Sequence, residues 1–141
     1  MPKPTRVSPA SLRAAADRQR IGTPYRYGNT VCARTEHWDA VIVRRQQSAI
    51  QWRTALADRM DAAGVTELHA STVRLAERPV FRSPVVTVTA YAYADGSVFL
   101  YRHGSRFYSP AHFRRLFDGF HYLHNGRATD ATVDALPSDR A

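Results

Sequence analysis

The range Ser83–Phe120 reads SPVVTVTAYAYADGSVFLYRHGSRFYSPAHFRRLFDGF and carries the clearest structural signals in the chain. Hydrophobic and polar or aromatic side chains alternate through Val85–Tyr93, which is typical of a β-strand. Asp95-Gly96 follows, a dipeptide favoured in hairpin turns because a type I′ turn needs positive φ at both central residues. Residues 97–102 alternate again, and residues 106–108 form a short third run, so the range predicts three consecutive antiparallel strands.

A capped helix is predicted directly after these strands. Ser109 is suited to the N-cap position because its hydroxyl accepts a hydrogen bond from an exposed amide of the first turn. Pro110 follows at the first helical position, where its missing N–H has no cost. Phe113, Leu116 and Phe117 then repeat at the three- and four-residue spacing of an apolar helical face.

The rest of the chain adds one long helix and at least one more extended segment. Apolar residues recur at helical spacing from Thr35 to Ala63, and residues 65–81 have strand character with alternating Leu, Ala, Thr and Val. We therefore predict an α+β fold, in which an antiparallel sheet of three to four strands packs against one long helix in the order α-β-β-β-α. A short N-terminal helix and flexible tails complete it. The expected divisions are a basic N-terminal arm with the short helix over 1–34, a single α+β domain over 35–127, and an acidic disordered tail over 128–141.

The basic charge of the chain is unevenly distributed. The 141 residues carry a formal net charge of +8, of which residues 1–34 contribute +6 and residues 79–127 contribute +4, whereas residues 128–141 contribute −2. Charge asymmetry of this kind favours polyanionic partners. A single cysteine, Cys32, excludes an internal disulfide, and the N-terminus lacks the apolar run of a signal peptide. We expect a cytoplasmic protein, or one assembled inside a host cell, without a membrane partner.

Nucleic-acid binding without catalysis is the function that these features favour most. Strand alternation would place Tyr91, Tyr93, Phe99 and Tyr101 on one face of the hairpin, where exposed rings could stack on bases. Arginines near the ends of the hairpin and in the basic arm would contact phosphates. The sequence does not distinguish DNA from RNA as the partner. The candidate binding residues are Arg26, Arg102, Arg106, Arg114, Arg115, Tyr91, Tyr93 and Tyr101.

Two other functions fit the same residues. A protein–protein module, such as a structural subunit or inhibitor encoded by a phage or plasmid, would use the long helix or a sheet face for self-association or partner binding. A metal-independent ribonuclease would use the groups clustered around one turn for acid–base chemistry. Those groups are Tyr101, Arg102, His103, Arg106 and Tyr108.

Neither a metal site nor a cofactor is expected. His121 and His124 share a spacing of three, and Cys32 and His37 a spacing of five, but neither pair belongs to a four-ligand pattern. The chain contains no glycine-rich phosphate loop and no nucleophile motif.

Overall fold

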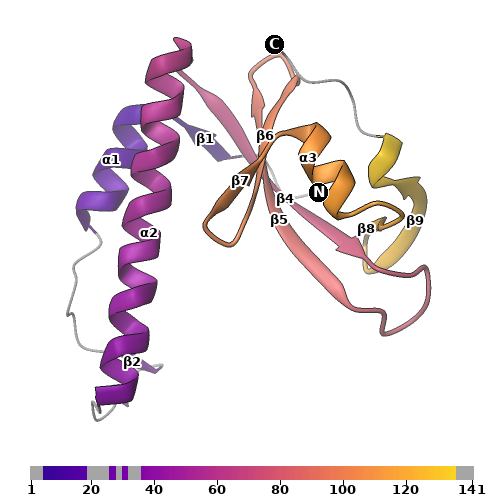
Figure 1. The fold of residues 1–141 in the computed structure, drawn as a ribbon, viewed down its shortest axis with the longest axis horizontal. Coiled ribbons are helices and arrows are strands. Elements are labelled where there is room, and N and C mark those ends of the chain that lie inside the picture. Colours follow the sequence, from indigo (N-terminus) through magenta and orange to yellow (C-terminus); the bar gives the residue numbers. More distant parts are fainter. Residues whose placement is uncertain (1–4, 19–25, 28–29, 32–35, 136–141) are drawn as a thin grey trace. The chain divides into compact units, whose positions relative to one another are not determined.

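A computed structural model describes residues 5–18, 26–27, 30–31 and 36–135 (Figure 1). The chain divides into two compact units, which are described separately. Residues 1–7 and 67–141 form the sheet unit, and residues 8–66 form the helical unit. These boundaries differ from the expected division, because the long helix belongs with the N-terminal helix and β1 belongs with the sheet.

The helical unit pairs two helices. The long helix α2 (Glu36–Ala63) has the predicted extent, and Gly64 follows it with a φ of 69°, a left-handed conformation that glycine adopts readily. It packs along α1 (Pro9–Arg18). The unit also holds a two-stranded ribbon of β2 (Arg26–Tyr27) and β3 (Thr30–Val31).

The expected packing of one long helix on a three- to four-stranded sheet is therefore wrong for the described residues. Helix α2 has its partner in α1, whose Leu12 and Ala16 are buried, and α2 itself buries Leu56 and Met60. An apolar stripe at helical spacing shows that one face of a helix is covered, and here another helix fulfils that role.

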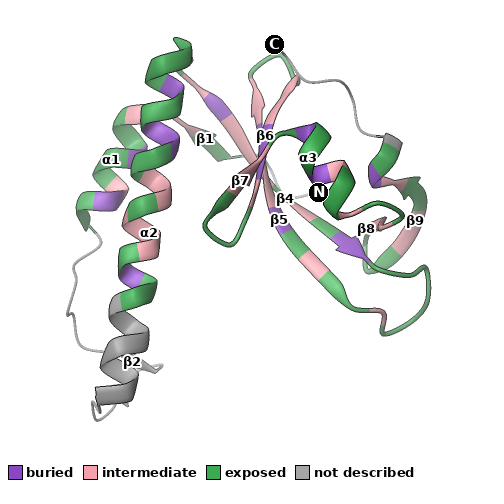
Figure 2. Ribbon diagram, in the orientation of Figure 1, coloured by how far each residue is buried: buried purple, intermediate pink, exposed green. Residues whose placement is uncertain are grey.

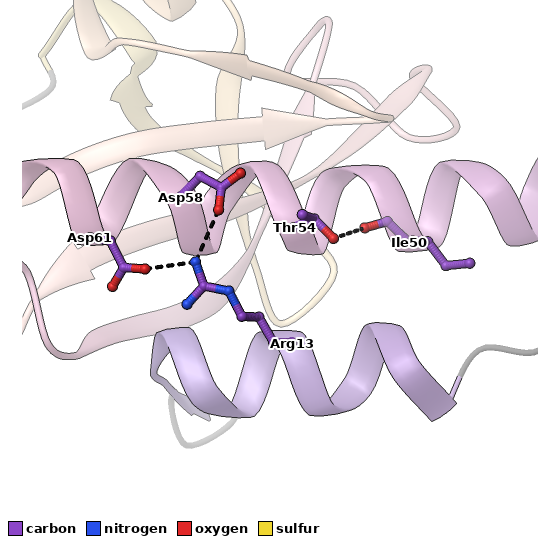
Figure 3. A network of polar contacts seen from close by, with 5 residues as sticks. All are labelled: Arg13, Ile50, Thr54, Asp58 and Asp61. Atoms are coloured by element: carbon purple, nitrogen blue, oxygen red, sulfur yellow. Dashed lines mark hydrogen bonds and ion pairs between the residues drawn. The ribbon is translucent and has the colours of Figure 1, made fainter.

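Arginine and aspartate side chains connect the two helices. Arg13 of α1 donates hydrogen bonds from Nη2 to Asp58 Oδ1 at 2.9 Å and to Asp61 Oδ2 at 2.6 Å, both on α2 (Figure 3). The Asp61 carboxylate, and then Asp58, raise the pKa of the Arg13 guanidinium above its ordinary value. The charge of this arginine is thus compensated inside its own unit.

The sheet unit is built on seven antiparallel strands. The strands run in the spatial order β7-β6-β5-β4-β8-β9, and β1 also pairs with β4. Three strands occur where alternation predicted them, and β4 occupies the predicted extended segment. Sheet elements in chain order are β1 (Thr5–Val7), β4 (Leu68–Ala76), β5 (Val85–Tyr93), β6 (Val98–His103), β7 (Arg106–Tyr108), α3 (Pro110–Leu116), β8 (His121–His124), β9 (Arg127–Thr132) and the 3₁₀ turn η1 (Val133–Ala135).

The acidic C-terminal segment is a second correction. Residues 128–132 were expected in a disordered tail, yet they lie in β9 and pair with β8. Val133 of η1 is completely buried in the core, and its N–H donates to the carbonyl oxygen of Phe120 at 3.1 Å. Residues 136–141 lie outside the described range. Backbone pairing and one buried valine thus order a segment with little apolar surface.

Strand register corrects the predicted grouping of the tyrosines. In the β5–β6 pair Tyr91 lies opposite Leu100 and Ala90 lies opposite Tyr101, and the register then shifts so that Ala92 lies opposite Val98. Residues directly opposite each other in an antiparallel pair share a face. Tyr91 and Tyr101 therefore lie on opposite faces of the sheet, and not on the single aromatic face that alternation suggested.

Helix α3 covers the face that carries Tyr101. The Phe113 ring stacks on the Tyr101 ring with centroids 4.1 Å apart and an interplanar angle of 9°. Ser109 caps the helix as predicted, accepting a hydrogen bond at its Oγ from the His112 N–H at 3.3 Å. Figure 2 shows buried positions on α3 and on the strands. The buried residues of this core are Leu75, Val88, Tyr101, Phe113 and Val133.

No helix among the described residues combines the length and the apolar character needed to cross a membrane.

Phe113→Ala is expected to lower the free energy of unfolding by about 3–5 kcal/mol, because it removes a fully buried ring and leaves a cavity against Tyr101. Leu116→Ala is the matched control, since Leu116 lies on the same helix with 49% of its surface exposed. It should change the free energy of unfolding by about 0.5 kcal/mol or less. Urea denaturation measures both, and equal losses would contradict the assigned core.

Burial raises the pKa of the Tyr122 phenol, and the Tyr101 hydroxyl opposes part of that rise. The folded state therefore holds this proton more tightly than the unfolded chain, so the contribution of Tyr122 to stability falls as pH rises above about 10. Urea denaturation of the wild type and of Tyr122→Phe should show a constant difference in stability below about pH 9, and the wild type losing stability relative to the variant as pH rises above about 10. A pH-independent difference would contradict this.

Candidate functional site

Two of the tyrosines predicted to stack on bases are buried. Tyr91 is 2% exposed and Tyr101 is 3% exposed, and the Tyr101 ring is occupied by Phe113. Tyr93 is half-buried and meets the Phe99 ring edge-on, with centroids 5.3 Å apart. A ring must offer an open face to stack on a base, so Tyr91 and Tyr101 do not form the proposed platform.

The predicted arginines do not gather into one surface. Arg102 is held on the sheet, where its guanidinium donates to the Gly104 carbonyl oxygen and, at 3.5 Å, to Thr89 Oγ1. It lies opposite Thr89, on the sheet face away from α3, whereas Arg114 and Arg115 are on α3. Arg106 is exposed on β7. Arg26 is in β2 of the helical unit, and its side chain lies outside the described set.

Two of the residues proposed for a ribonuclease, His103 and Tyr101, are held in structural contacts. His103 Nδ1 lies 3.3 Å from the Thr87 carbonyl oxygen, and its ring meets Phe117 edge-on with centroids 6.0 Å apart. Tyr101, the first residue of that set, is buried in the core. Within the described residues, no group of three or more His, Cys, Asp or Glu side chains is arranged to hold a metal ion.

A groove at another part of the sheet unit brings exposed arginines together. It lies between the β4–β5 turn and the β8–β9 hairpin, which are at the same end of the sheet (Figure 1). We call it the arginine groove; its volume is about 420 Å³. It is lined by Arg74, Ala76, Pro79, Val80, Phe81, Arg82, Ser83, Val85, Leu123, Gly126, Arg127 and Ala128.

Strand register explains how β4 and β5 contribute to this groove. Arg74 lies opposite Thr87, and Ala76 lies opposite Val85, on the sheet face away from α3. Arg74, Thr87 and Val85 are exposed, so this end of the face is open. The same face is closed at its other end, where Tyr91 is buried. The groove therefore occupies the open end of one sheet face.

The β4–β5 turn is shaped by three hydrogen bonds. The Glu77 N–H donates to the Pro84 carbonyl oxygen at 3.0 Å, and the Arg78 N–H donates to Ser83 Oγ at 2.8 Å. The Ser83 N–H donates to the Val80 carbonyl oxygen at 3.2 Å and closes a tight turn around Phe81 and Arg82. Most of this turn is exposed in Figure 2. The turn thus presents its side chains from a fixed backbone.

Positive charge in the arginine groove is not compensated by neighbouring carboxylates. Arg74, Arg82 and Arg127 are all exposed, and none of the three forms an ion pair with a described residue. No lining residue is acidic. Within the part of the chain that the structure describes, one of these guanidinium groups has a contact: that of Arg82 lies over the Phe81 ring at 5.4 Å from its centroid. This arrangement offers three charged donors to an anionic ligand.

Sequence reasoning missed this groove because its arginines are distant in the chain. In the sequence RPVFRSP (residues 78–84), Pro79 and Pro84 bracket residues 80–83, which is the pattern of an ordinary connection between strands. Its local signal is an aromatic residue between two arginines in a constrained turn. Arg74 and Arg127 join it only through the strand pairing. No protein-family model matches the sequence, and comparisons with curated proteins and with solved structures likewise gave no significant match.

Arg82 has a φ of 61°, a left-handed backbone conformation that costs non-glycine residues about 1–2 kcal/mol. Arg82→Gly should therefore keep the free energy of unfolding at the wild-type level or raise it by up to about 1 kcal/mol. Arg78→Gly in the same turn is the control, because Arg78 lacks a positive φ, and it should lower stability by about 0.4–1 kcal/mol. Thermal and urea denaturation would measure both; equal losses would contradict the turn geometry.

Proposed function

We propose that this chain is a non-enzymatic nucleic-acid-binding protein whose contact surface is the arginine groove. The observation that supports the proposal is the set of three exposed arginines, none of them in an ion pair with a described residue, that line one concave site without a lining carboxylate. Guanidinium groups match phosphate geometry with two parallel hydrogen bonds. A phosphate backbone supplies several such anions at regular spacing, which a groove with arginines on separate walls can contact together.

Net charge alone does not select this surface. Each of the two units carries a formal net charge of +4. In the helical unit Arg13 forms ion pairs with Asp58 and Asp61. In the sheet unit Nε of Arg6, on β1, lies 3.8 Å from Oε1 of Glu67. The groove arginines, in contrast, have no such partner in the described chain. The positive electrostatic field of these arginines is therefore available to attract an anionic ligand. Salt weakens this attraction, so the rate of association depends on salt concentration.

The mode of binding differs from the one that the sequence suggested. Phosphate contacts are assigned here to Arg74, Arg82 and Arg127 in place of the arginines near β6, β7 and α3. A binding reaction of this kind releases counterions from the nucleic acid, so the logarithm of the binding constant should fall linearly with the logarithm of salt concentration.

The triple variant Arg74→Gln/Arg82→Gln/Arg127→Gln should lose at least about tenfold in affinity for a labelled oligonucleotide at low salt, and its salt-dependence slope should shrink by about 2, at roughly 0.7 per lost phosphate contact on a single strand. The matched control is Arg106→Gln/Arg115→Gln, which removes two exposed arginines outside the groove lining. Its affinity should change by less than about threefold. Fluorescence anisotropy across a salt series measures both.

Two outcomes would contradict the proposal. The wild type could fail to bind DNA or RNA even at low ionic strength. Alternatively, the Arg106 and Arg115 control could lose as much affinity as the triple variant. That result would indicate that the nucleic acid contacts the arginines of β7 and α3 as much as those of the groove.

A further inference from the structure

Phe81 occupies an unusual position for a large apolar side chain. It lies at the apex of the β4–β5 turn with 91% of its surface exposed, beside Val80 at 59%. Its one ring contact within the described ranges is with the guanidinium of Arg82. The turn that carries it is closed by hydrogen bonds at both ends. Phe81 and Val80 form an exposed apolar patch beside the groove, and exposed apolar patches of this kind often mark binding sites.

We propose that Phe81 is a stacking platform for an unpaired base, so that the ligand of the arginine groove is single-stranded nucleic acid. This inference rests on the proposed function and specifies its substrate. Arg82 lies over one face of the ring, and a base would stack on the other. Arg74 and Arg127, which line the same groove, would contact the phosphates next to that base. An aromatic side chain beside a basic groove is the usual arrangement for binding single strands without sequence preference.

The structure favours a single strand over a duplex. In a duplex each base face is covered by its neighbours, and opening a base step costs a few kcal/mol before Phe81 could make contact. Bases of a single strand are already accessible. The groove volume of about 420 Å³ also lies within the usual range for sites that hold one small-molecule-sized group.

An anionic membrane surface would meet the same tip differently. Val80 and Phe81, flanked by Arg78 and Arg82, have the composition of an interfacial anchor. A membrane surface is broad, however, and would contact the apex of the turn without entering the concave site where Arg74 and Arg127 lie. Only an extended, flexible polyanion can contact the apex and the groove together, and this favours the nucleic acid.

The test uses the full chain, a labelled single-stranded oligonucleotide of mixed sequence, the duplex of the same length, and vesicles containing phosphatidylserine. Phe81→Ala should weaken single-strand binding by about tenfold to a hundredfold, because one base–aromatic stack is lost. Its salt-dependence slope should not change, because no charge is removed. Phe81→Trp should bind the single strand at least as well as the wild type. Phe81→Leu, which keeps apolar surface but lacks a π face, should behave like Phe81→Ala.

The remaining outcomes separate the alternatives. If the wild type binds the duplex as tightly as the single strand, the preference for an unpaired base is wrong and the inference is overturned. If Phe81→Ala binds the single strand like the wild type while the groove arginine variant is impaired, base stacking is wrong and the proposed function stands. If the wild type binds neither nucleic acid, the proposed function fails as well. If the wild type and Phe81→Leu bind vesicles equally while Phe81→Ala does not, the tip is a membrane anchor and the inference is overturned. Leu116→Ala serves as the exposed apolar control and should leave all three affinities unchanged.

Discussion

The uninterrupted pairing of β4 with β5 is the constraint on which the sheet unit depends. Nine consecutive residue pairs, from Leu68 opposite Tyr93 to Ala76 opposite Val85, fix which side chains share each face. One face then carries Leu75 and Val88 into the core under α3, and the other carries Arg74 to the open end. A slip of one residue would exchange these sets and bury the arginine, which is why the register is strongly specified. The position of the β4–β5 turn follows from the same pairing.

Local signals account for what the sequence predicted well. Alternation, the Asp95-Gly96 turn and the Ser109 cap each depend on residues close together in the chain, and β5, β6, β7 and α3 formed where these signals lie. The sequence did not show which distant elements pack or pair with each other. The stripe on α2 indicated a covered face but not that α1 covers it. Strand β9 contains no large apolar residue, and it is ordered by backbone pairing with β8 and by Val133 next to it.

The candidate site was less predictable than the fold for two physical reasons. The pairing of β5 with β6 shifts by one residue at Tyr91/Ala92. Beyond that point the side chains of β6 lie on the opposite face from the one that simple alternation along the sequence gives, so Tyr101 is assigned to the wrong face. The groove, in turn, depends on pairing between strands that the sequence did not connect. Arg127 reaches it through the β8–β9 hairpin and β8's pairing with β4, directly before the segment that was expected to be a disordered tail. Net charge could indicate a polyanionic partner but not the surface that meets it.

The groove is a candidate anion site because its arginines lack the ion pairs that Arg13 forms elsewhere in the described chain. Arg13 shows that this chain can compensate an arginine fully when two carboxylates lie one helical turn apart on a neighbouring helix. Around the groove, three exposed arginines instead line one site that has no lining carboxylate, so their charge is reduced only by water and salt. Uncompensated positive charge of this kind favours any anion that enters. The same turn that contributes Arg82 also exposes Phe81, so charge and aromatic surface are offered to one ligand at one place.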